Sequence, residues 1–410
     1  GTIAPDLWRF KDTDGDGVAD IREVVVHGFG VHMGYAGHDM HGLTVGPDGR
    51  IYWSIGDKGV NVTSREGRTF YFPNEGCIMR IEPDGSNFEI YAHGVRNPQE
   101  PQFDDFGDLF AVDNDADMAG EHERFIYIPE ASDSGWRCNY QYMKEASPWM
   151  REGIWRPAFP GQATYFLPPI QLAWDGPAGF RHEPGTALGQ AQRGTFVLNE
   201  FPSGKMRSFR IVPDGASFRM ADQHLVNDGV MGIGFAWHPN GKLFMADWIG
   251  GYPLDGIGAV WSIDTRANDQ HPLRAETQRL LAAGFAHAAD DALLKWLGHA
   301  DQRVRQGAQL ELAKRNRADA LLKVAADGQA ALLARVHALW GYGQLLRRTA
   351  ASVAPVLPLL GDASDEIRRQ TVKIIGDAAT TGAKTAGSHL IPLLNDTSPR
   401  VRALTAIAVG

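Results

Sequence analysis

Up to about residue 266, the chain repeats one short pattern, a tight turn followed by a strand in which apolar and polar residues alternate. The pattern occurs at residues 46–58, 103–115 and 238–248, and Pro-Asp-Gly turns recur at 82–85 and 212–215. Proline presets φ at the second turn position and glycine supplies the positive φ that follows, so these turns have a physical cause. Short strands joined by similar turns favour a β-propeller, with a β-sandwich as the alternative.

The composition changes near residue 266, where Gly, Pro and aromatic residues give way to Ala, Leu and Arg. Beyond this point, apolar residues recur at i, i+3 and i+4, which indicates amphipathic helices. An Asp-Arg pattern repeats with a period of about 32 residues, typical of a helical solenoid. Its copies are Asp301 and Arg305, Asp365 and Arg368, and Asp396 and Arg402, with a degenerate copy at Arg335.

We therefore predict two domains, a propeller over residues 1–266 and an α-solenoid of HEAT-like repeats over residues 273–410. Residues 7–29 have the pattern of outer blade strands, so a closed ring would need strands from outside this chain. The chain stops at Gly410 within a helix pair, so we expect a truncated array or a partner that covers its end. We interpret the repeated arginines as groups that bond within the repeats, not as a ligand site.

Charge and composition exclude several classes of protein. The net charge is −9, and no run of Lys and Arg is long enough to suggest nucleic-acid binding. No apolar stretch approaches the length needed to span a membrane. The two cysteines, Cys77 and Cys138, can form one disulfide or remain two buried thiols. No Cys-x-x-Cys-His motif occurs, so the chain carries no covalently attached haem.

Residues 12–23, DTDGDGVADIRE, fit the twelve-residue template of a calcium loop. A sharp turn is needed at Gly17, and clustered carboxylates repel one another without a cation. The flanking segments are typical of strands, which predicts a static structural site, with a solvated acidic turn as the alternative. The predicted ligands are Asp12, Asp14, Asp16, the carbonyl of Val18, Asp20 and Glu23.

His38 and Asp57 lie at the two ends of the hairpin that contains the first turn. A hairpin returns the chain to its starting point, so the two side chains can meet across its base. An imidazole braced by a carboxylate is a common general base near neutral pH. His41 is a rival on the same loop, and His-x-x-His could form a metal pair, although no third ligand is evident. A capping role is the alternative for both His38 and Asp57.

Three segments resemble the soluble PQQ-dependent glucose/sorbosone dehydrogenases, which are six-bladed propellers. They are the stretch from His38 to Asn61, the segment HGVRNPQ at 93–99 and the segment DSGWRCNY at 133–140. The acidic loop with a C-terminal helical array is similar to a bacterial subgroup often labelled membrane-bound dehydrogenases. That subgroup joins the propeller to HEAT-like repeats and frequently to a cytochrome c domain. The resemblance covers residues 7–266, and the remainder only by repeat type.

The resemblance implies an oxidoreductase that oxidises an aldose or related polyol, with PQQ as hydride acceptor and calcium as a second cofactor. His38 would be the general base, and Asp57 would hold its tautomer. Arg96 and Asn97 would donate to the quinone oxygens, and Gln99 belongs to the same cofactor loop. Asp113 and Asp115 follow a strand where the family holds a calcium ion. A periplasmic or extracellular location and a cytochrome c-type electron acceptor are also implied.

One stretch departs from the family. Met231 and Ile233 stand where the family carries paired arginines for the cofactor carboxylates, and Lys205 is the nearest basic residue.

Two other functions therefore remain open. One is a non-catalytic propeller that binds carbohydrate or protein, with a partner docked on the helical repeats. The other is a calcium-propeller lyase or hydrolase. The Trp residues, including Trp136 and Trp248, are interpreted as blade packing.

Overall fold

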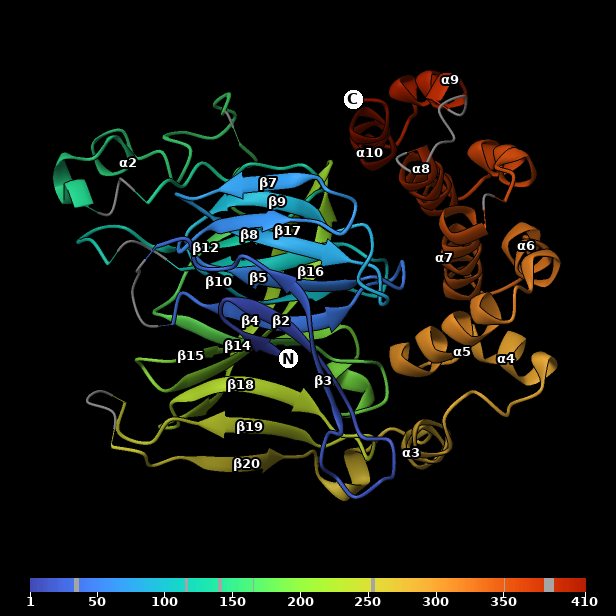
Figure 1. Ribbon diagram of the computed structural model, residues 1–410, viewed down its shortest axis with the longest axis horizontal. Coiled ribbons are helices and arrows are strands. Elements are labelled where there is room, and N and C mark those ends of the chain that lie inside the picture. Colours follow the sequence, from blue (N-terminus) through green and yellow to red (C-terminus); the bar gives the residue numbers. More distant parts are fainter. Residues whose placement is uncertain are drawn as a thin grey trace.

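Antiparallel sheets form the first part of the chain, and helices form the last part (Figure 1). The structure is a computed structural model. It describes residues 1–32, 37–114, 117–138, 142–164, 166–251, 255–349, 351–379 and 387–410. The last long strand ends at Ile263, and the first long helix begins at Arg274.

Within each main sheet, the strands pair in the order in which they occur in the chain, which is the arrangement that short turns dictate. The hairpin β6–β7 is inserted between β5 and β8. The strands are β1 (Thr2–Ile3), β2 (Asp6–Lys11) and β3 (Ile21–His27); β4 (Met40–Val45), β5 (Ile51–Ile55), β8 (Gly76–Ile81) and β9 (Glu89–Val95); β6 (Val60–Thr63) and β7 (Thr69–Phe72); β10 (Pro98–Phe103), β11 (Leu109–Asp113), β12 (Glu123–Tyr127) and β13 (Gln171–Ala173); β14 (Pro177–His182), β15 (Thr195–Glu200), β16 (Lys205–Asp214) and β17 (Ser217–Asp228); and β18 (Gly232–Trp237), β19 (Leu243–Asp247) and β20 (Ala259–Ile263).

The first strands of four successive sheets, β4, β10, β14 and β18, lie next to one another in that order. Successive antiparallel sheets whose first strands are neighbours make a propeller-like arrangement. Pairs of aromatic rings fill the space between the sheets, as where Phe110 meets Phe196 and Phe125 meets Phe180. Each turn pattern found in the sequence joins two strands of one sheet. The first sheet holds more than the outer strands expected at residues 7–29. The short strand β1 pairs with β2 and lies on the side toward β4.

The helical part is a row in which α5, α7, α8 and α10 pack one against the next around a single apolar core. A short helix, α2 (Pro148–Arg151), lies instead in the propeller-like part. The other helices are α3 (Arg274–Ala283), α4 (Asp290–Trp296), α5 (Gln302–Lys314), α6 (Ala318–Ala326), α7 (Leu332–Thr349), α8 (Asp365–Ala379), α9 (Gly387–Leu390) and α10 (Pro399–Val409), with 3₁₀ segments at Ala354–Gly361 and Ile391–Asn395.

The repeated arginines bond within the repeats, which confirms their interpretation. In three copies, a guanidinium Nη1 donates to the carbonyls six and five residues earlier in the chain. These arginines are Arg305, Arg368 and Arg402. Arg368 also pairs with Asp396 of the next repeat at 2.7 Å. Each guanidinium thereby ties the turn before a helix to the helix that follows it.

One side of the helical row lies against the turns of the sheets (Figure 1). Gln309 of α5 donates to the carbonyl of Pro47 at 2.7 Å, and Arg369 of α8 donates to Asp108 at 2.6 Å. Arg347 of α7 reaches the carbonyl of Asp48. One side of the helical row is therefore occupied in part by the sheets of the same chain, and the predicted protein partner of the array stays a prediction.

Cys77 and Cys138 are both buried free thiols, so of the two alternatives the second holds. In the part of the chain that the structure describes, no helix is both long and apolar enough to cross a membrane.

Candidate active site

Strand register brings His38 and Asp57 together. In the β4–β5 pair, Met40 lies opposite Ile55. Extending an antiparallel register by two residues in each direction places residue 38 opposite residue 57. His38 Nδ1 lies 2.7 Å from Asp57 Oδ1, and both side chains are at most 5% exposed. Because an ionised carboxylate only accepts, the imidazole donates from Nδ1 and carries its lone pair on Nε2 when neutral.

The second oxygen of Asp57 has its own donor. The indole Nε1 of Trp136 donates to Asp57 Oδ2 at 2.9 Å, and the indole is buried. The backbone N–H of Asp57 donates to the carbonyl of Arg96. The carboxylate is therefore held at both oxygens and its backbone is tied to the neighbouring sheet, so it presents one fixed edge to His38.

Arg96 and Asn97 lie in the tight connection between β9 and β10, and Asp113 holds that connection in place. Asp113 Oδ1 accepts from the backbone N–H of Arg96 at 2.8 Å and of Asn97 at 3.0 Å. Its Oδ2 pairs with Arg124. The guanidinium of Arg96 donates to Asn114 and pairs with Asp117. The Asp113 carboxylate thus fixes two predicted cofactor ligands from behind.

A cleft of about 2100 Å³, measured out to where it opens to solvent, contains most of the predicted site. His38, Arg96, Asn97, Gln99 and Lys205 all line it. Asp57 supports His38 from behind. The structure therefore brings together residues that lie as far apart in the sequence as 38 and 205. The aromatic side chains that line the cleft are Trp174, Phe201 and Trp248.

Cationic and acidic groups both line the cleft. The cations are Arg96, Lys205 and Arg207, and Arg207 pairs with the buried Glu200. The carboxylates are Asp117, Glu121, Glu123, Asp175 and Glu200. Ile233 also lines the cleft, at a position where the resemblance implied a cation. Among the charged groups of the cleft, carboxylates therefore outnumber cations.

His41 lies in β4 and not on the loop where the sequence placed it. Its Nε2 lies 2.6 Å from the carbonyl of Gly37, so the ring donates to a neutral group and has no carboxylate brace. Burial lowers the pKa of His41, and the Gly37 carbonyl only partly opposes this effect. Although His41 also lines the cleft, its partner makes it a weaker general base than His38.

The acidic loop follows β2 and is exposed. Ligand atoms of Asp12, Asp14 and Asp20 lie within 4.8 Å of one another. The backbone N–H groups of Gly17 and Gly15 donate to Asp12 and lower its pKa. Asp16 accepts from the N–H of Val18 in the same loop.

Glu23, the predicted bidentate ligand, lies in β3 and pairs with Arg9 of β2 instead of joining the three aspartates. Calcium binding by this loop, and by the carbonyl of Val18, stays a prediction. The second predicted calcium site, at Asp113 and Asp115, has fewer free ligand atoms among the described residues than the acidic loop. Both oxygens of Asp113 are already used by N–H donors and Arg124, and Asp115 lies outside the described residues.

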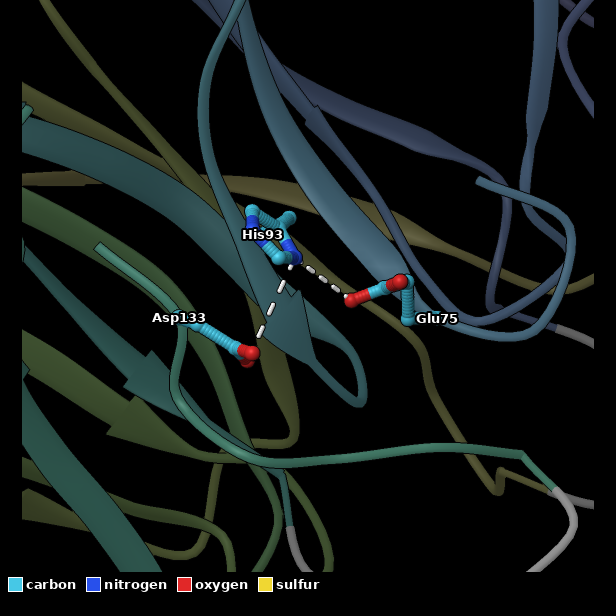
Figure 2. A group of neighbouring side chains, drawn as sticks. All are labelled: Glu75, His93 and Asp133. Carbon is cyan, nitrogen blue, oxygen red and sulfur yellow. Dashed lines mark hydrogen bonds and ion pairs between the residues drawn. The ribbon is translucent and has the colours of Figure 1, made fainter. Parts of the chain in front are cut away.

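Another cluster near the site was not predicted (Figure 2). Ligand atoms of Glu75, His93 and Asp133 lie within 4.8 Å of one another, a spacing that a metal ion could use. However, Arg137 already lies between the two carboxylates, 2.9 Å from Glu75 and 2.8 Å from Asp133. The guanidinium supplies the positive charge that a metal would bring, so the cluster is better described as an ion-pair network.

Sequence reasoning missed three residues of the site. Trp136 and Trp248 were interpreted as packing, but Trp136 donates to Asp57 and Trp248 lines the cleft and stacks on Phe201. Arg207 follows Lys205 by two residues on β16, and side chains two apart share a face of a strand. That spacing was a usable signal. The Trp136 contact spans 79 positions of sequence and left no local signal.

A domain family described as a domain of unknown function, DUF7133, matches residues 2–147. No curated protein matches the chain.

Several solved structures are similar at low identity. A glucose dehydrogenase is 13% identical, with 62% of this chain and 72% of that chain covered and a TM-score of 0.46. A PQQ-bound aldose sugar dehydrogenase from Streptomyces coelicolor is 17% identical, with 62% and 70% covered and a TM-score of 0.41. The holo PQQ domain of a pyranose dehydrogenase from Coprinopsis cinerea is 14% identical, with 58% and 84% covered and a TM-score of 0.31. Likenesses at these scores do not assign an activity to this chain.

Proposed function

We propose that this protein is a quinoprotein-type oxidoreductase that oxidises an aldose or related polyol in the cleft, with His38 as general base. The observation that carries the proposal is the buried chain from Trp136 through Asp57 to His38, which ends at the wall of a large cleft. A buried carboxylate that orients a histidine is the arrangement used where a hydroxyl proton is removed. Aromatic faces beside hydrogen-bonding groups, as in this cleft, also suit a sugar.

In the proposed reaction, His38 Nε2 takes the proton from a substrate hydroxyl while the C–H bond on the same carbon breaks. Asp57 stabilises the imidazolium as it forms, because its carboxylate lies 2.7 Å from Nδ1. PQQ, when bound, would accept the hydride, so that the substrate loses two electrons and the carbinol becomes a carbonyl. The proton then leaves His38 to solvent at the open side of the cleft.

Arg96, Asn97 and Lys205 are the residues that would hold PQQ. In the described part of the chain, the buried Nε of Arg96 and Oδ1 of Asn97 have no hydrogen-bond partner, and no ion pair is present at Lys205. Lys205 can offer a cation to one cofactor carboxylate, and Arg96 can place a donor where negative charge develops on a quinone oxygen. The donor set therefore fits the quinone end of the cofactor and one of its carboxylates.

Reconstitution tests the proposal. The protein is incubated with PQQ and calcium, freed of excess cofactor, and assayed for dye-linked oxidation of a panel of aldoses and polyols. We expect retained quinone absorbance and turnover with at least one sugar. Failure to retain PQQ, with no turnover on any member of the panel, would contradict the proposal.

A second candidate function is carbohydrate binding without a cofactor. The excess of carboxylates in the cleft favours it, because these groups repel a tricarboxylate but bind neutral sugar hydroxyls well. Calorimetric titration distinguishes the two functions. Sugar binding by protein that does not bind PQQ would support the second candidate.

The remaining expectations belong to the same proposal. Residues 1–266 would be the catalytic propeller of six-bladed type, and residues 273–410 a HEAT-like array. Reduced cofactor would pass its electrons to a cytochrome c-type partner in the periplasm or outside the cell. The arrangement of the helices against the sheet turns supports a bracing role for the array.

A further inference from the structure

The segment that carries Trp136 is bound along the edge of β9. The backbone N–H of Ser134 donates to the carbonyl of His93 at 3.0 Å, and the N–H of Trp136 donates to Gly94 at 2.7 Å. His93 also pairs with Asp133 in a parallel bridge. These bonds extend the sheet by a short strand-like segment. They fix the backbone at Trp136 and therefore the position of its indole relative to Asp57.

Gly94 permits this close approach. Its φ is +73°, and a Cβ built on it would lie 1.9 Å from Asp133 Oδ1 and 2.8 Å from the backbone N of Ser134. Any other residue would therefore have to push the segment away from β9. The glycine is needed for packing as well as for its backbone conformation.

Side chains fasten the same segment from the other side, as Figure 2 shows for three of them. Asp133 accepts from the backbone N–H of Gly135 at 2.9 Å and pairs with Arg137. Arg137 reaches Glu75, which in turn contacts His93 Nδ1 at 2.7 Å. The network thus links the segment to Glu75, just before β8 begins, and to β9 through charge-assisted hydrogen bonds.

We propose that Trp136 is a positioning residue for the general base, holding the Asp57 carboxylate against Nδ1 of His38 through its indole N–H. This inference rests on the proposed role of His38. Residues 132–138 act as the support that fixes the indole, through the edge of β9 and the network of Glu75, His93, Asp133 and Arg137. The guanidinium of Arg96 lies 5.9 Å from the Trp136 ring and packs the indole from the cleft side.

The physical reason is the cost of an unsatisfied buried oxygen. Asp57 is 1% exposed, so its Oδ2 has no access to bulk water if the indole N–H is removed. The carboxylate then gains by turning toward another donor, and the bond that selects the Nδ1–H tautomer of His38 weakens. When the two tautomers exchange, Nε2 carries the lone pair that accepts the substrate proton for only part of the time.

Trp136→Phe is the main test, because it removes the N–H and keeps an aromatic ring. Trp155→Phe is the matched control. Trp155 belongs to the same aromatic cluster and is also buried, but its Nε1 has no hydrogen-bond partner among the described residues. Protein with ¹⁵N-labelled histidine reports the tautomer of His38, whose signals are identified by their absence in His38→Gln. This measurement needs no cofactor.

The wild type and Trp155→Phe should show one His38 tautomer, with the proton on Nδ1. Trp136→Phe should show a mixture of both tautomers, and in PQQ-loaded protein its kcat should fall about 10- to 100-fold with KM within about twofold of wild type. If Trp136→Phe does not fold, benzothienylalanine at position 136 removes the N–H and preserves the shape of the indole.

The outcomes separate the two proposals. If Trp136→Phe keeps a single Nδ1–H tautomer, the positioning role is overturned, whatever the activity. If the tautomer changes as expected but no variant or wild-type protein turns over any sugar, the positioning role stands and the proposed oxidation fails.

Discussion

At the scale of single residues, the candidate site depends on a carboxylate held at both oxygens. Asp57 accepts from His38 at 2.7 Å and from Trp136 at 2.9 Å, and neither bond is exposed to solvent. A second pair in the chain, His27 and Asp6, has the same 2.7 Å distance, but its histidine is 73% exposed and lies away from the cleft. Equal distances therefore do not imply equal functions, and burial beside a cleft distinguishes the two pairs.

Replacing the base gives the first prediction. His38→Gln should lower kcat by about 10²- to 10⁴-fold, because a positioned general base contributes that range. KM should change little, since glutamine fills a similar part of the cleft wall and can still hydrogen-bond a substrate hydroxyl. Dye-linked assays of PQQ-loaded protein measure both constants. His27→Gln is the matched control and should retain wild-type kcat; an equal loss in both variants would contradict the role of His38.

Replacing the brace gives the second prediction. Asp57→Asn keeps the shape of the side chain but removes the charge that stabilises the imidazolium. We expect kcat to fall by about 10²-fold or more while PQQ binding, measured by fluorescence titration, stays within about threefold of wild type. An unchanged kcat in Asp57→Asn would show that the carboxylate only caps the hairpin.

The sequence predicted this pair because a hairpin register is local. Residues 38 and 57 flank one turn, so their meeting follows from strand alternation and the turn type. Trp136 could not be predicted in the same way, since its contact with Asp57 depends on how a segment beyond β12 returns to the edge of β9. Arg207 could have been predicted from its spacing to Lys205 on one strand.

At the scale of elements, the acidic loop between β2 and β3 is the predicted calcium site. Its aspartates are held mainly by their own backbone N–H groups, which leaves repulsion among them uncompensated without a cation. We expect chelation of calcium to lower the melting temperature by several degrees, because a ligand that binds only the folded state stabilises it. Thermal scans with calcium and with chelator measure the difference.

Asp14→Asn should remove most of this calcium dependence, while Asp84→Asn, in a turn outside the loop, should leave it intact. Equal melting temperatures of the wild-type protein with calcium and with chelator would refute calcium binding.

The connection after β14 supplies a prediction about pH. Glu183 is buried and accepts from the N–H groups of Gly185, Ala187 and Leu188. Burial raises the pKa of Glu183 to about 7, and the three N–H groups only partly oppose this. Between the unfolded pKa near 4.5 and the folded value, the native state holds more protons than the unfolded state, so this group makes the protein less stable as the pH rises.

Glu183→Gln removes the titration. The free energy of unfolding of Glu183→Gln minus that of wild type should increase by about 2 to 3 kcal/mol from pH 5 to pH 8. This figure follows from 1.36 kcal/mol per pKa unit. Urea denaturation at three or four pH values measures this change. A difference between the two proteins that does not vary with pH would contradict the raised pKa.

At the scale of the whole molecule, the helical array and the sheets share a buried polar interface. Arg369 is 5% exposed and bonds Asp108, Glu366 and the carbonyl of Phe106. Arg400 pairs with the same Asp108. Removing one partner from such a network leaves buried charge uncompensated, which costs more than the network itself contributes.

Arg369→Met should therefore lower the free energy of unfolding by about 3 kcal/mol, measured by chemical denaturation. Arg402→Met is the control, because Arg402 is exposed and, among the described residues, its hydrogen bonds go to carbonyls of its own repeat, so its effect should stay within about 0.5 kcal/mol. Similar losses in both variants would show that the buried interface contributes no more to stability than the exposed hydrogen bonds of Arg402.

The helices and the hairpins were predictable at this scale, because both follow from periodic patterns of neighbouring residues. Their docking was not, since Gln309 and Arg369 occupy helix positions that look like ordinary polar faces in the sequence. The sheet turns at Pro47 and Asp108 meet one side of the array, and the predicted protein partner stays a prediction.

The most direct test of the central claim is a single turnover without oxygen. PQQ-loaded protein is mixed with a sugar found active in steady state, and the loss of the oxidised quinone absorbance is followed in wild type, His38→Gln and His27→Gln. The account predicts equal rates for wild type and His27→Gln and a rate lower by about 10²-fold or more for His38→Gln. Equal rates for all three proteins would contradict His38 as the base.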